Sequence, residues 1–296
     1  MFILSRKTKN GIAGYLFLLP WLAGLFGLTL IPMIVSLYFS FTRYDMLTPA
    51  VPIGVQNYID LFKDPRFITS LKVTFKFVFV SVPLQLAFAL LIAIMLKRNR
   101  RGIKVYRALY YLPSLFGGSI AVSILWRQIF NKDGVFNQLL GIFGMEGKNW
   151  IALPATALNT LIVLAVWQFG SSMVIFLASL KQIPEDYYEA ATLDGAGKIA
   201  QFFNITLPLL TPMVFFNIVM TVINAFKSFN SAYIISNGTG GPLDSTMFYS
   251  LYLYIKGFNH FQMGYASAMA WLLLLIIAIV TGAMFLFAKY WVFYDE

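Results

Sequence analysis

The chain has 296 residues, of which 59% are hydrophobic and only 11% are charged. Soluble domains carry about 25% charged residues, so this composition indicates that much of the surface faces lipid. Cysteine is absent, which excludes disulfides and thiolate chemistry, and a single histidine, His260, argues against histidine metal sites and catalytic triads. We therefore expect no catalytic residue and no metal site.

The formal net charge of +10 raises the possibility of nucleic-acid binding. The basic residues, however, lie at the edges of apolar runs and are not interleaved with aromatic residues in a polar domain. This placement is typical of membrane topology signals, and we expect no nucleic-acid partner.

Six stretches lack Asp, Glu, Lys and Arg and approach or exceed the roughly 20 residues that a helix needs to cross a bilayer. In chain order they lie between Lys9 and Arg43, Lys76 and Lys97, Arg107 and Arg127, Lys148 and Lys181, Lys198 and Lys227, and Lys256 and Lys289. The third is the weakest, because Gly117, Gly118 and Ser119 interrupt it. The first is much longer than the apolar core of a signal peptide, so we expect it to be retained.

Orientation follows from the excess of Lys and Arg in short cytoplasmic loops. The segment between the second and third spans holds six cations and no acid: Lys97, Arg98, Arg100, Arg101, Lys104 and Arg107. An even number of spans then places both termini in the cytoplasm, in agreement with Arg6, Lys7 and Lys9 before the first span. The expected outer loops are Thr42–Ser70, Asn131–Trp150 and about Lys227–Met263, and the glycines and proline of Ser236–Pro242 forbid a continuous helix in the last. We expect one transmembrane domain over 1–296.

The cytoplasmic segment between the fourth and fifth spans predicts a short helix. Pro184 suits a first turn, and the acids Glu185, Asp186 and Glu189 are favourable near the positive end of a helix. Gly195 and Gly197 should end the helix, and Pro208 should lie near the start of the next span. A short helix on the membrane face is a suitable docking element for a partner.

The segment 183–208 resembles the signature loop of the permeases of bacterial ABC importers. That loop reads Glu-Ala-Ala, three residues, Gly, nine residues, Ile, one residue and Leu-Pro, which is matched here by Glu189, Ala190, Ala191, Gly195, Ile205, Leu207 and Pro208. Asp194 before the glycine, Ile-Pro upstream and Gly240–Pro242 downstream are similar to the carbohydrate branch, typified by the maltose and glycerol-phosphate permeases.

The resemblance implies an all-α, type I importer permease with a cytoplasmic coupling helix, in a bacterial cytoplasmic membrane. Its implied partners are a second permease, generally a different paralogue, two ABC ATPase subunits and an extracellular solute-binding protein. The chain has no Gly-x-x-x-x-Gly-Lys-Ser/Thr phosphate loop. We therefore expect no cofactor on this chain, with ATP and Mg held by the ATPase subunits. The implied coupling residues are Glu189, Ala190, Ala191, Asp194, Gly195, Ile205, Leu207 and Pro208.

Polar and aromatic residues inside the fourth and fifth spans are candidates for the solute pathway, because they are costly against lipid. Aromatic rings and amide side chains suit the C–H faces and hydroxyls of sugars. By resemblance to the maltose-type permeases, the candidate pathway residues are Trp167, Gln168, Ser171, Asn224, Phe226 and Asn230. Arg127 and Lys227 near span ends remain unassigned, because snorkelling at the interface explains them as well as an acidic solute does.

Three alternatives stay open. One is an ABC permease for a non-sugar solute such as an amino acid or phosphate ester. Another is an ion-coupled secondary transporter or channel, which usually carries an intramembrane acid, whereas no Asp or Glu lies in the six stretches. The last, an intramembrane enzyme, is disfavoured by the scarcity of His, Cys and buried carboxylates.

Overall fold

The computed structural model describes residues 17–97 and 101–293. Within these ranges five helices are long and apolar enough to cross a membrane, and a bent helix pair brings the number to six. The prediction of an all-α membrane protein with about six spans is confirmed. Arg6, Lys7, Lys9, Arg98, Asn99 and Arg100 lie outside the described residues.

The long spans fit the apolar windows of the sequence. They are Phe17–Ser40, Pro65–Lys97, Pro154–Gln182, Lys198–Phe226 and Met263–Ala288. The first includes α2 (Ile31–Ser40), the second is α4 (Pro65–Lys97), the third joins α8 (Pro154–Trp167) and α9 (Gly170–Gln182), the fourth ends in α12 (Leu207–Phe226), and the fifth is α15 (Met263–Ala288).

The bent pair consists of α5 (Ile103–Phe116) and α6 (Ile120–Ile129), which meet at an angle of 101°. The break falls at Gly117 and Gly118, and the Ser119 hydroxyl caps α6 by accepting from the Val122 N–H at 3.2 Å. The weakest of the six predicted spans is therefore broken where its glycines stand.

The second span begins earlier than its apolar window. Helix α4 starts at Pro65, not near Lys76, so the expected outer loop Thr42–Ser70 is wrong at its C-terminal end. The apolar run marks only the part that faces lipid, whereas Lys72 and Lys76 are good helix formers and do not end the helix. The shortened loop holds two two-residue strands, β1 (Thr42–Arg43) and β2 (Val51–Pro52), and helix α3 (Gln56–Lys63).

Two prolines inside spans each follow a π-helical turn. The turn Leu25–Leu30 precedes Pro32, and the turn Phe202–Thr206 precedes Pro208. A proline ring clashes with the carbonyl four residues earlier, and a widened turn relieves that clash. The prediction that Pro208 lies near the start of its span is therefore wrong, because the helical span already begins at Lys198.

The described residues divide into two compact units. The first contains the residues up to Lys63 together with Tyr254–Leu272. Within it, the buried Asn57 amide donates to the carbonyls of Ser40 and Thr42 at 2.9 Å each. Gly264 approaches the same segment closely, since a Cβ there would lie 2.1 Å from the Thr42 carbonyl oxygen. This unit contains β1, β2 and α3 between the end of the first span and the start of the last.

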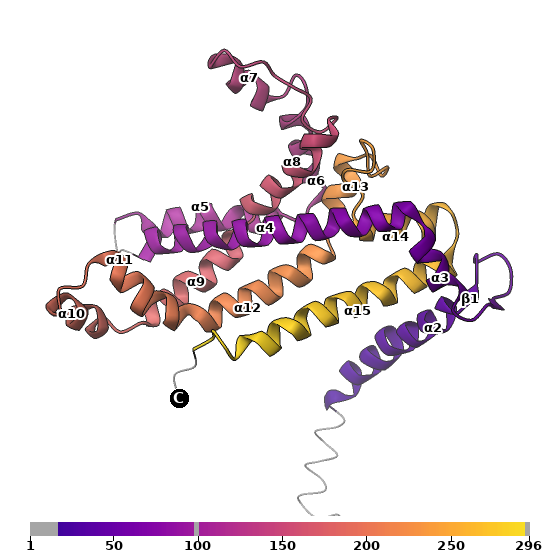
Figure 1. Cartoon of the computed structure of the whole chain (residues 1–296), viewed down its shortest axis with the longest axis horizontal. Coiled ribbons are helices and arrows are strands. Elements are labelled where there is room, and N and C mark those ends of the chain that lie inside the picture. The colour runs from indigo at the N-terminus through magenta and orange to yellow at the C-terminus, as the bar shows by residue number, and fades with distance from the viewer. Residues whose placement is uncertain (1–16, 98–100, 294–296) are drawn as a thin grey trace, which may run out of the picture. The chain divides into compact units, whose positions relative to one another are not determined.

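The second unit contains Asp64–Leu253 and the residues from Leu273 onward. Helix α4 packs against α8, α9 and α12, and α5 packs against α9; Figure 1 shows α4, α9 and α12 side by side. Fully buried apolar side chains fill the contacts, among them Leu161, Leu164, Met173, Phe176 and Leu210. The unit also holds α7 (Val135–Ile142), α10 (Asp186–Leu193), α11 (Lys198–Gln201), α13 (Asn230–Ile235) and most of α14 (Tyr249–Tyr254).

A polar cluster ties the turns after α13 to the start of α4. The Arg66 guanidinium donates two hydrogen bonds to Asp244, at 2.7 and 3.0 Å, and the Tyr252 hydroxyl donates to Asp64 at 2.5 Å. We call these four residues the Arg66 cluster. The chain between α13 and α14 forms turns, as the glycines and proline of 236–242 predict.

Candidate functional site

A cavity of about 430 Å³ opens between α4, α8, α9 and α12 of the second unit. Sixteen residues line it and none is charged. Ten of them are polar, namely Ser81, Gln85, Ser114, Gln168, Ser171, Ser172, Asn217, Thr221, Asn224 and Ser228. The cavity therefore offers neutral hydrogen-bonding groups in a largely apolar bundle, which suits a neutral polar ligand.

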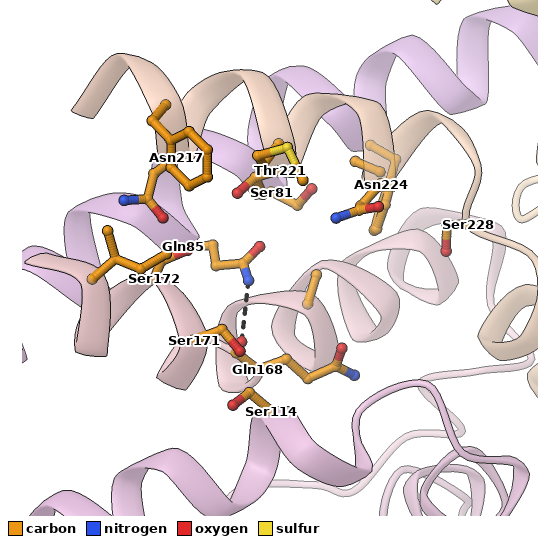
Figure 2. Close-up of a pocket in the computed structure, with 16 residues that line it drawn as sticks. Ser81, Gln85, Ser114, Gln168, Ser171, Ser172, Asn217, Thr221, Asn224 and Ser228 are labelled. Atoms are coloured by element: carbon orange, nitrogen blue, oxygen red, sulfur yellow. Dashed lines mark hydrogen bonds between the residues drawn. The ribbon is translucent and has the colours of Figure 1, made fainter. Parts of the chain in front are cut away.

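Helical spacing brings these side chains to one place. Asn217, Thr221 and Asn224 follow one another at four and three residues along α12, which puts them on one helix face. Ser81 and Gln85 are likewise four residues apart on α4. Figure 2 shows the α12 side chains facing Gln168 and Ser171 across the cavity.

Two helix breaks border the cavity, and side-chain amides satisfy their carbonyls. Gln85 Nε2 donates to the Gln168 carbonyl at 3.2 Å, where α8 ends. Gln168 Nε2 donates to the Gly117 carbonyl at 2.8 Å, and Asn230 Nδ2 donates to the Gly118 carbonyl at 3.1 Å. In a membrane an unpaired carbonyl is costly, so these amides stabilise both helix breaks by pairing the carbonyls there.

A glycine permits the close approach of the fourth span to α5. Gly170 begins α9, and a Cβ there would lie 2.6 Å from the Tyr110 carbonyl oxygen and 2.8 Å from Tyr111 Cα. Any larger residue would push α9 away from α5. Gly170 therefore stands where α9 begins after the break and allows the narrow contact between α9 and α5.

Several cavity groups remain available to a ligand. Within the described residues, the side chains of Ser171, Thr221 and Asn224 make no hydrogen bond to the protein. Asn217 differs, because it is 2% exposed and donates to the Met213 carbonyl of its own helix at 2.9 Å. The free hydroxyls and amide can both donate to and accept from a solute hydroxyl.

Four of the six predicted pathway residues line a cavity. Gln168, Ser171 and Asn224 line the cavity. Asn230 and Gln168 line an adjoining cavity of about 250 Å³, which shares Phe77, Ala165, Gln168 and Ser228 with the first.

The other two pathway residues, Trp167 and Phe226, line neither cavity. Phe226 is 1% exposed and meets the Phe75 ring edge-on at 5.2 Å, so packing accounts for it. Trp167 lies against Trp126, with ring centroids 5.6 Å apart.

Helices α4 and α5 also contribute to the cavity, which the sequence prediction did not include. Ser81, Gln85 and Ser114 line the cavity but lie outside the polar clusters of the fourth and fifth spans. A signal was present, since Ser81 and Gln85 are polar residues four apart inside an apolar span.

The short helix predicted between the fourth and fifth spans is α10, Asp186–Leu193. It ends in a Schellman motif, in which Ala196 N–H donates to the Ala191 carbonyl at 2.8 Å and Gly195 N–H donates to the Thr192 carbonyl at 3.0 Å. Gly195 has φ of +80°, a conformation that favours glycine. Gly197 does not end this helix as expected; it has φ of −70° and caps the start of α11.

Few contacts join α10 to the bundle. The Tyr188 hydroxyl bonds the Thr206 hydroxyl at 2.9 Å, and Lys97 Nζ lies 4.4 Å from the centroid of the Tyr188 ring. Gln201 Nε2 donates to the Thr192 hydroxyl at 2.9 Å. No residue of α10 is buried, and Leu193 is 89% exposed. Figure 1 shows α10 at the end of the unit where α4 stops.

The two halves of the signature share one groove. The groove, about 510 Å³ in volume, is lined on one side by Ala190, Ala191 and Asp194, and on the other by Ile205 and Pro208. The alanines keep the groove open, because larger side chains at these positions would enter it. Of the other three predicted coupling residues, Glu189 and Gly195 are exposed beside the groove, and Leu207 begins α12.

Comparison with known proteins gives a family. The protein family described as "Binding-protein-dependent transport system inner membrane component" matches residues 11–291 of this chain. The chain is 53% identical to the probable ABC transporter permease protein YesP of Bacillus subtilis (strain 168), over 97% of this chain and 94% of that protein. It is 31% identical to the lactose transport system permease protein LacF of Rhizobium radiobacter, over 96% and 97% of the two chains.

A solved structure supports the fold. A chain of the bacterial alginate ABC transporter, in complex with an alginate pentasaccharide-bound periplasmic protein, superposes with a TM-score of 0.83 and 20% identity over 96% of both chains. At this identity the likeness establishes the fold alone. The family match covers nearly the whole chain and agrees with this fold. This chain therefore belongs to the binding-protein-dependent transport system inner membrane components and is a multi-pass permease subunit of an ABC transporter, not an enzyme.

Proposed function

We propose that this chain forms half of the pathway by which an ABC importer carries a sugar or oligosaccharide across the bacterial cytoplasmic membrane. The observation that carries the proposal is the uncharged cavity with its amides and hydroxyls. Sugar hydroxyls both donate and accept hydrogen bonds, as amides and hydroxyls do. Phe77 and Phe216 in the lining add apolar surface for sugar C–H faces.

Relatives support a saccharide. Proteins 28% to 32% identical to this chain bear names that refer to lactose, trehalose and maltose, starch degradation products or arabinooligosaccharides. A permease for a phosphate ester or amino acid would gain from charged groups in the pathway, whereas the lining of the larger cavity has none.

The proposed partners are a second permease of different sequence, two ATPase subunits that hold ATP and Mg, and an extracellular solute-binding protein. Helix α10 is the proposed coupling helix, seated in the ATPase. Its exposed Leu193 and the alanine-lined groove supply a shaped apolar surface for such a partner.

Both termini are proposed to be cytoplasmic. Supporting this, Lys97 of the cation-rich turn packs on Tyr188 of α10, so the basic turn and the proposed coupling helix lie at the same end of the unit. A membrane-impermeant thiol reagent applied to intact cells should label Leu47→Cys and Asn237→Cys, and should label Lys198→Cys only after permeabilisation. Asn57 is unsuitable because it is buried. Labelling of Lys198→Cys in intact cells would reverse the topology.

Transport in proteoliposomes tests the proposed function. The chain, its partner permease, ATPase and binding protein are reconstituted, and ATP-driven uptake of labelled saccharides, amino acids and glycerol phosphate is compared. Thr221→Val removes a free cavity hydroxyl at nearly constant volume and should lower saccharide uptake. Thr281→Val is the control, because that hydroxyl donates to the Ile277 carbonyl of its own helix. Uptake of amino acids or glycerol phosphate without any saccharide uptake would contradict the proposal.

A further inference from the structure

We infer that Tyr188 is a positioning residue, through which a displacement of α10 reaches the helices that line the cavity. This rests on the proposed function, in which α10 docks on the ATPase, and it names the contact that joins docking to solute binding. Helix α10 has eight residues, of which Tyr188 and Ala191 are half-buried and the others are exposed. Most of its surface is therefore free of the bundle, and its few contacts decide how its movement is passed on.

Tyr188 contacts the ends of two different helical segments. Its hydroxyl lies 2.9 Å from the Thr206 hydroxyl, and Lys97 Nζ lies 4.4 Å from the centroid of its ring. Thr206 is 7% exposed and is the last residue of the π-helical turn before α12, and Lys97 is the last residue of α4. A hydrogen bond to a buried hydroxyl and a cation over a ring are both attractive, so this one side chain joins α10 to α4 and α12.

Both segments lead to the cavity. Helix α4 carries Gln85, and α12 carries Thr221 and Asn224. At a rise of about 1.5 Å per residue, Thr206 lies about 22 Å along the helix from Thr221, and Lys97 about 18 Å from Gln85. Coupling between distant sites is carried by rigid elements of this kind. A displacement of Tyr188 therefore acts on polar groups of the cavity that belong to two separate helices.

The other connections of α10 do not reach α4. Gln201 Nε2 donates to the Thr192 hydroxyl at 2.9 Å and to the Ala196 carbonyl at 3.2 Å, which joins α10 only to the span that follows it. In that connection Gly195 and Gly197 have no atom within 4 Å of an added Cβ. Among the hydrogen bonds, ion pairs and ring contacts of the described residues, only those of Tyr188 join α10 to α4.

Loss of the Tyr188 contacts should let α10 follow the ATPase while α4 and α12 stay behind. ATP is then hydrolysed with less movement at the cavity, so fewer solute molecules are imported per ATP. A contact transmits at most its own interaction free energy. For one hydrogen bond this corresponds to roughly a two- to tenfold change in the number of solute molecules imported per ATP.

The test measures uptake and ATP hydrolysis together in the complete importer, reconstituted in proteoliposomes and supplied with labelled maltose, lactose, arabinotriose, amino acids and glycerol phosphate. Tyr188→Phe removes the hydroxyl and keeps the ring beside Lys97. We expect roughly two- to tenfold less solute per ATP, with ATP hydrolysis, ATPase retention and melting temperature at the wild-type level. Thr206→Val should have the same effect, and Thr206→Ser, which keeps a hydroxyl, should retain coupling.

Two further variants separate this contact from a general effect of losing a hydroxyl. Tyr188→Phe combined with Thr206→Val should lower solute per ATP no further than either change alone, because both remove the same bond. Tyr290→Phe is the matched control. Lys289 Nζ lies 4.9 Å from the centroid of the Tyr290 ring, but Tyr290 is 75% exposed and outside α10, so solute per ATP should not change.

The absence of cysteine allows a second readout that does not depend on the solute. Ser171→Cys places a thiol in the cavity, and its rate of modification by a thiol reagent is followed on this chain by mass spectrometry, with and without ATP and Mg. ATP should change this rate in the otherwise wild-type importer. The change should shrink when Tyr188→Phe is added and should persist when Tyr290→Phe is added.

The outcomes separate this inference from the proposed function. A wild-type number of solute molecules per ATP in Tyr188→Phe, an equal fall in Tyr290→Phe, or loss of the ATPase from Tyr188→Phe would overturn the role of Tyr188 and leave sugar import standing. Import of amino acids or glycerol phosphate without any saccharide, with fewer molecules per ATP in Tyr188→Phe, would overturn the proposed solute and support the role of Tyr188. A rate at Ser171→Cys that ignores ATP would contradict both.

Discussion

The cavity and helix α10 distribute polar and apolar side chains in opposite ways. The cavity gathers hydroxyls and amides inside an apolar bundle, including Ser81 and Asn217, which are 1% and 2% exposed. Helix α10 instead buries nothing and presents Leu193 at 89% exposure. Polar groups turned inward suit a polar solute, and apolar groups turned outward suit a protein partner. Each region departs from the usual pattern where a partner is proposed to bind.

Breaking the end of α10 should have the largest effect. Gly195→Val places a β-branched residue at φ of +80°, a conformation that costs an ordinary residue about 1–2 kcal/mol, and distorts the Schellman motif. We expect ATP-driven uptake to be abolished with membrane insertion intact, as measured by uptake and by retention of the ATPase during purification. Glu189→Ala should act more mildly.

Gly197→Val is the matched control for that variant, because Gly197 has φ of −70° and no atom within 4 Å of an added Cβ. Normal uptake by Gly195→Val, or equal loss in both variants, would remove the basis for assigning coupling to the end of α10.

Phe226 tests whether burial or solute contact explains an aromatic residue beside the cavity. Phe226→Ala opens a hole at a 1%-exposed position, and large-to-small changes of this kind cost about 3–5 kcal/mol. The purified complex should dissociate at a lower temperature than the wild type, as measured by size-exclusion chromatography after heating. Its solute preference should not change. Phe79→Ala, 66% exposed on α4, should melt near the wild type. A changed solute preference in Phe226→Ala would show that Phe226 contacts the solute, as the sequence predicted.

Asn224 tests the cavity directly. Removing its free amide takes away hydrogen bonds to the solute, each worth about 1 kcal/mol, so Asn224→Ala should lower saccharide uptake roughly five- to tenfold. ATPase retention and melting temperature should stay at the wild-type level. Asn159→Ala is the control, since Asn159 lies on α8 outside both cavities. Equal uptake by the two variants would count against the cavity as the pathway.

The Arg66 cluster sharpens the comparison because its polar groups are paired within the protein. Tyr252→Phe should leave transport unchanged and lower stability by about 1.5–3 kcal/mol, the value of a hydrogen bond to a charged group. Burial and the bond to Asp64 raise the pKa of the Tyr252 phenol. The stabilisation is therefore complete below the unfolded pKa of about 10 and is lost at higher pH.

Melting curves of Tyr252→Phe and wild type at pH 8 and above pH 10 give the check. The gap between them should narrow at the higher pH. A loss of uptake at pH 8 would show that this cluster serves transport as well as stability.

The sequence predicts the spans well because a bilayer imposes a simple rule on length and polarity. It also locates α10 and its glycine end, since Gly195 stands where an αL residue is needed. Start points such as Pro65 were missed because helices continue beyond the lipid-facing run. Spacing alone does not tell whether Phe226 or Asn224 faces the cavity, because that depends on which helices pack on either side of α12.

The amides that hold the helix breaks have a consequence for how firmly a solute can be kept. A sugar hydroxyl that takes the N–H by which Gln168 or Asn230 holds the Gly117 or Gly118 carbonyl must replace that existing bond. One hydrogen bond is then exchanged for another, and the net gain is small. A permease must release its solute in every transport cycle. Contacts formed by such an exchange allow it to recognise the solute and still release it quickly.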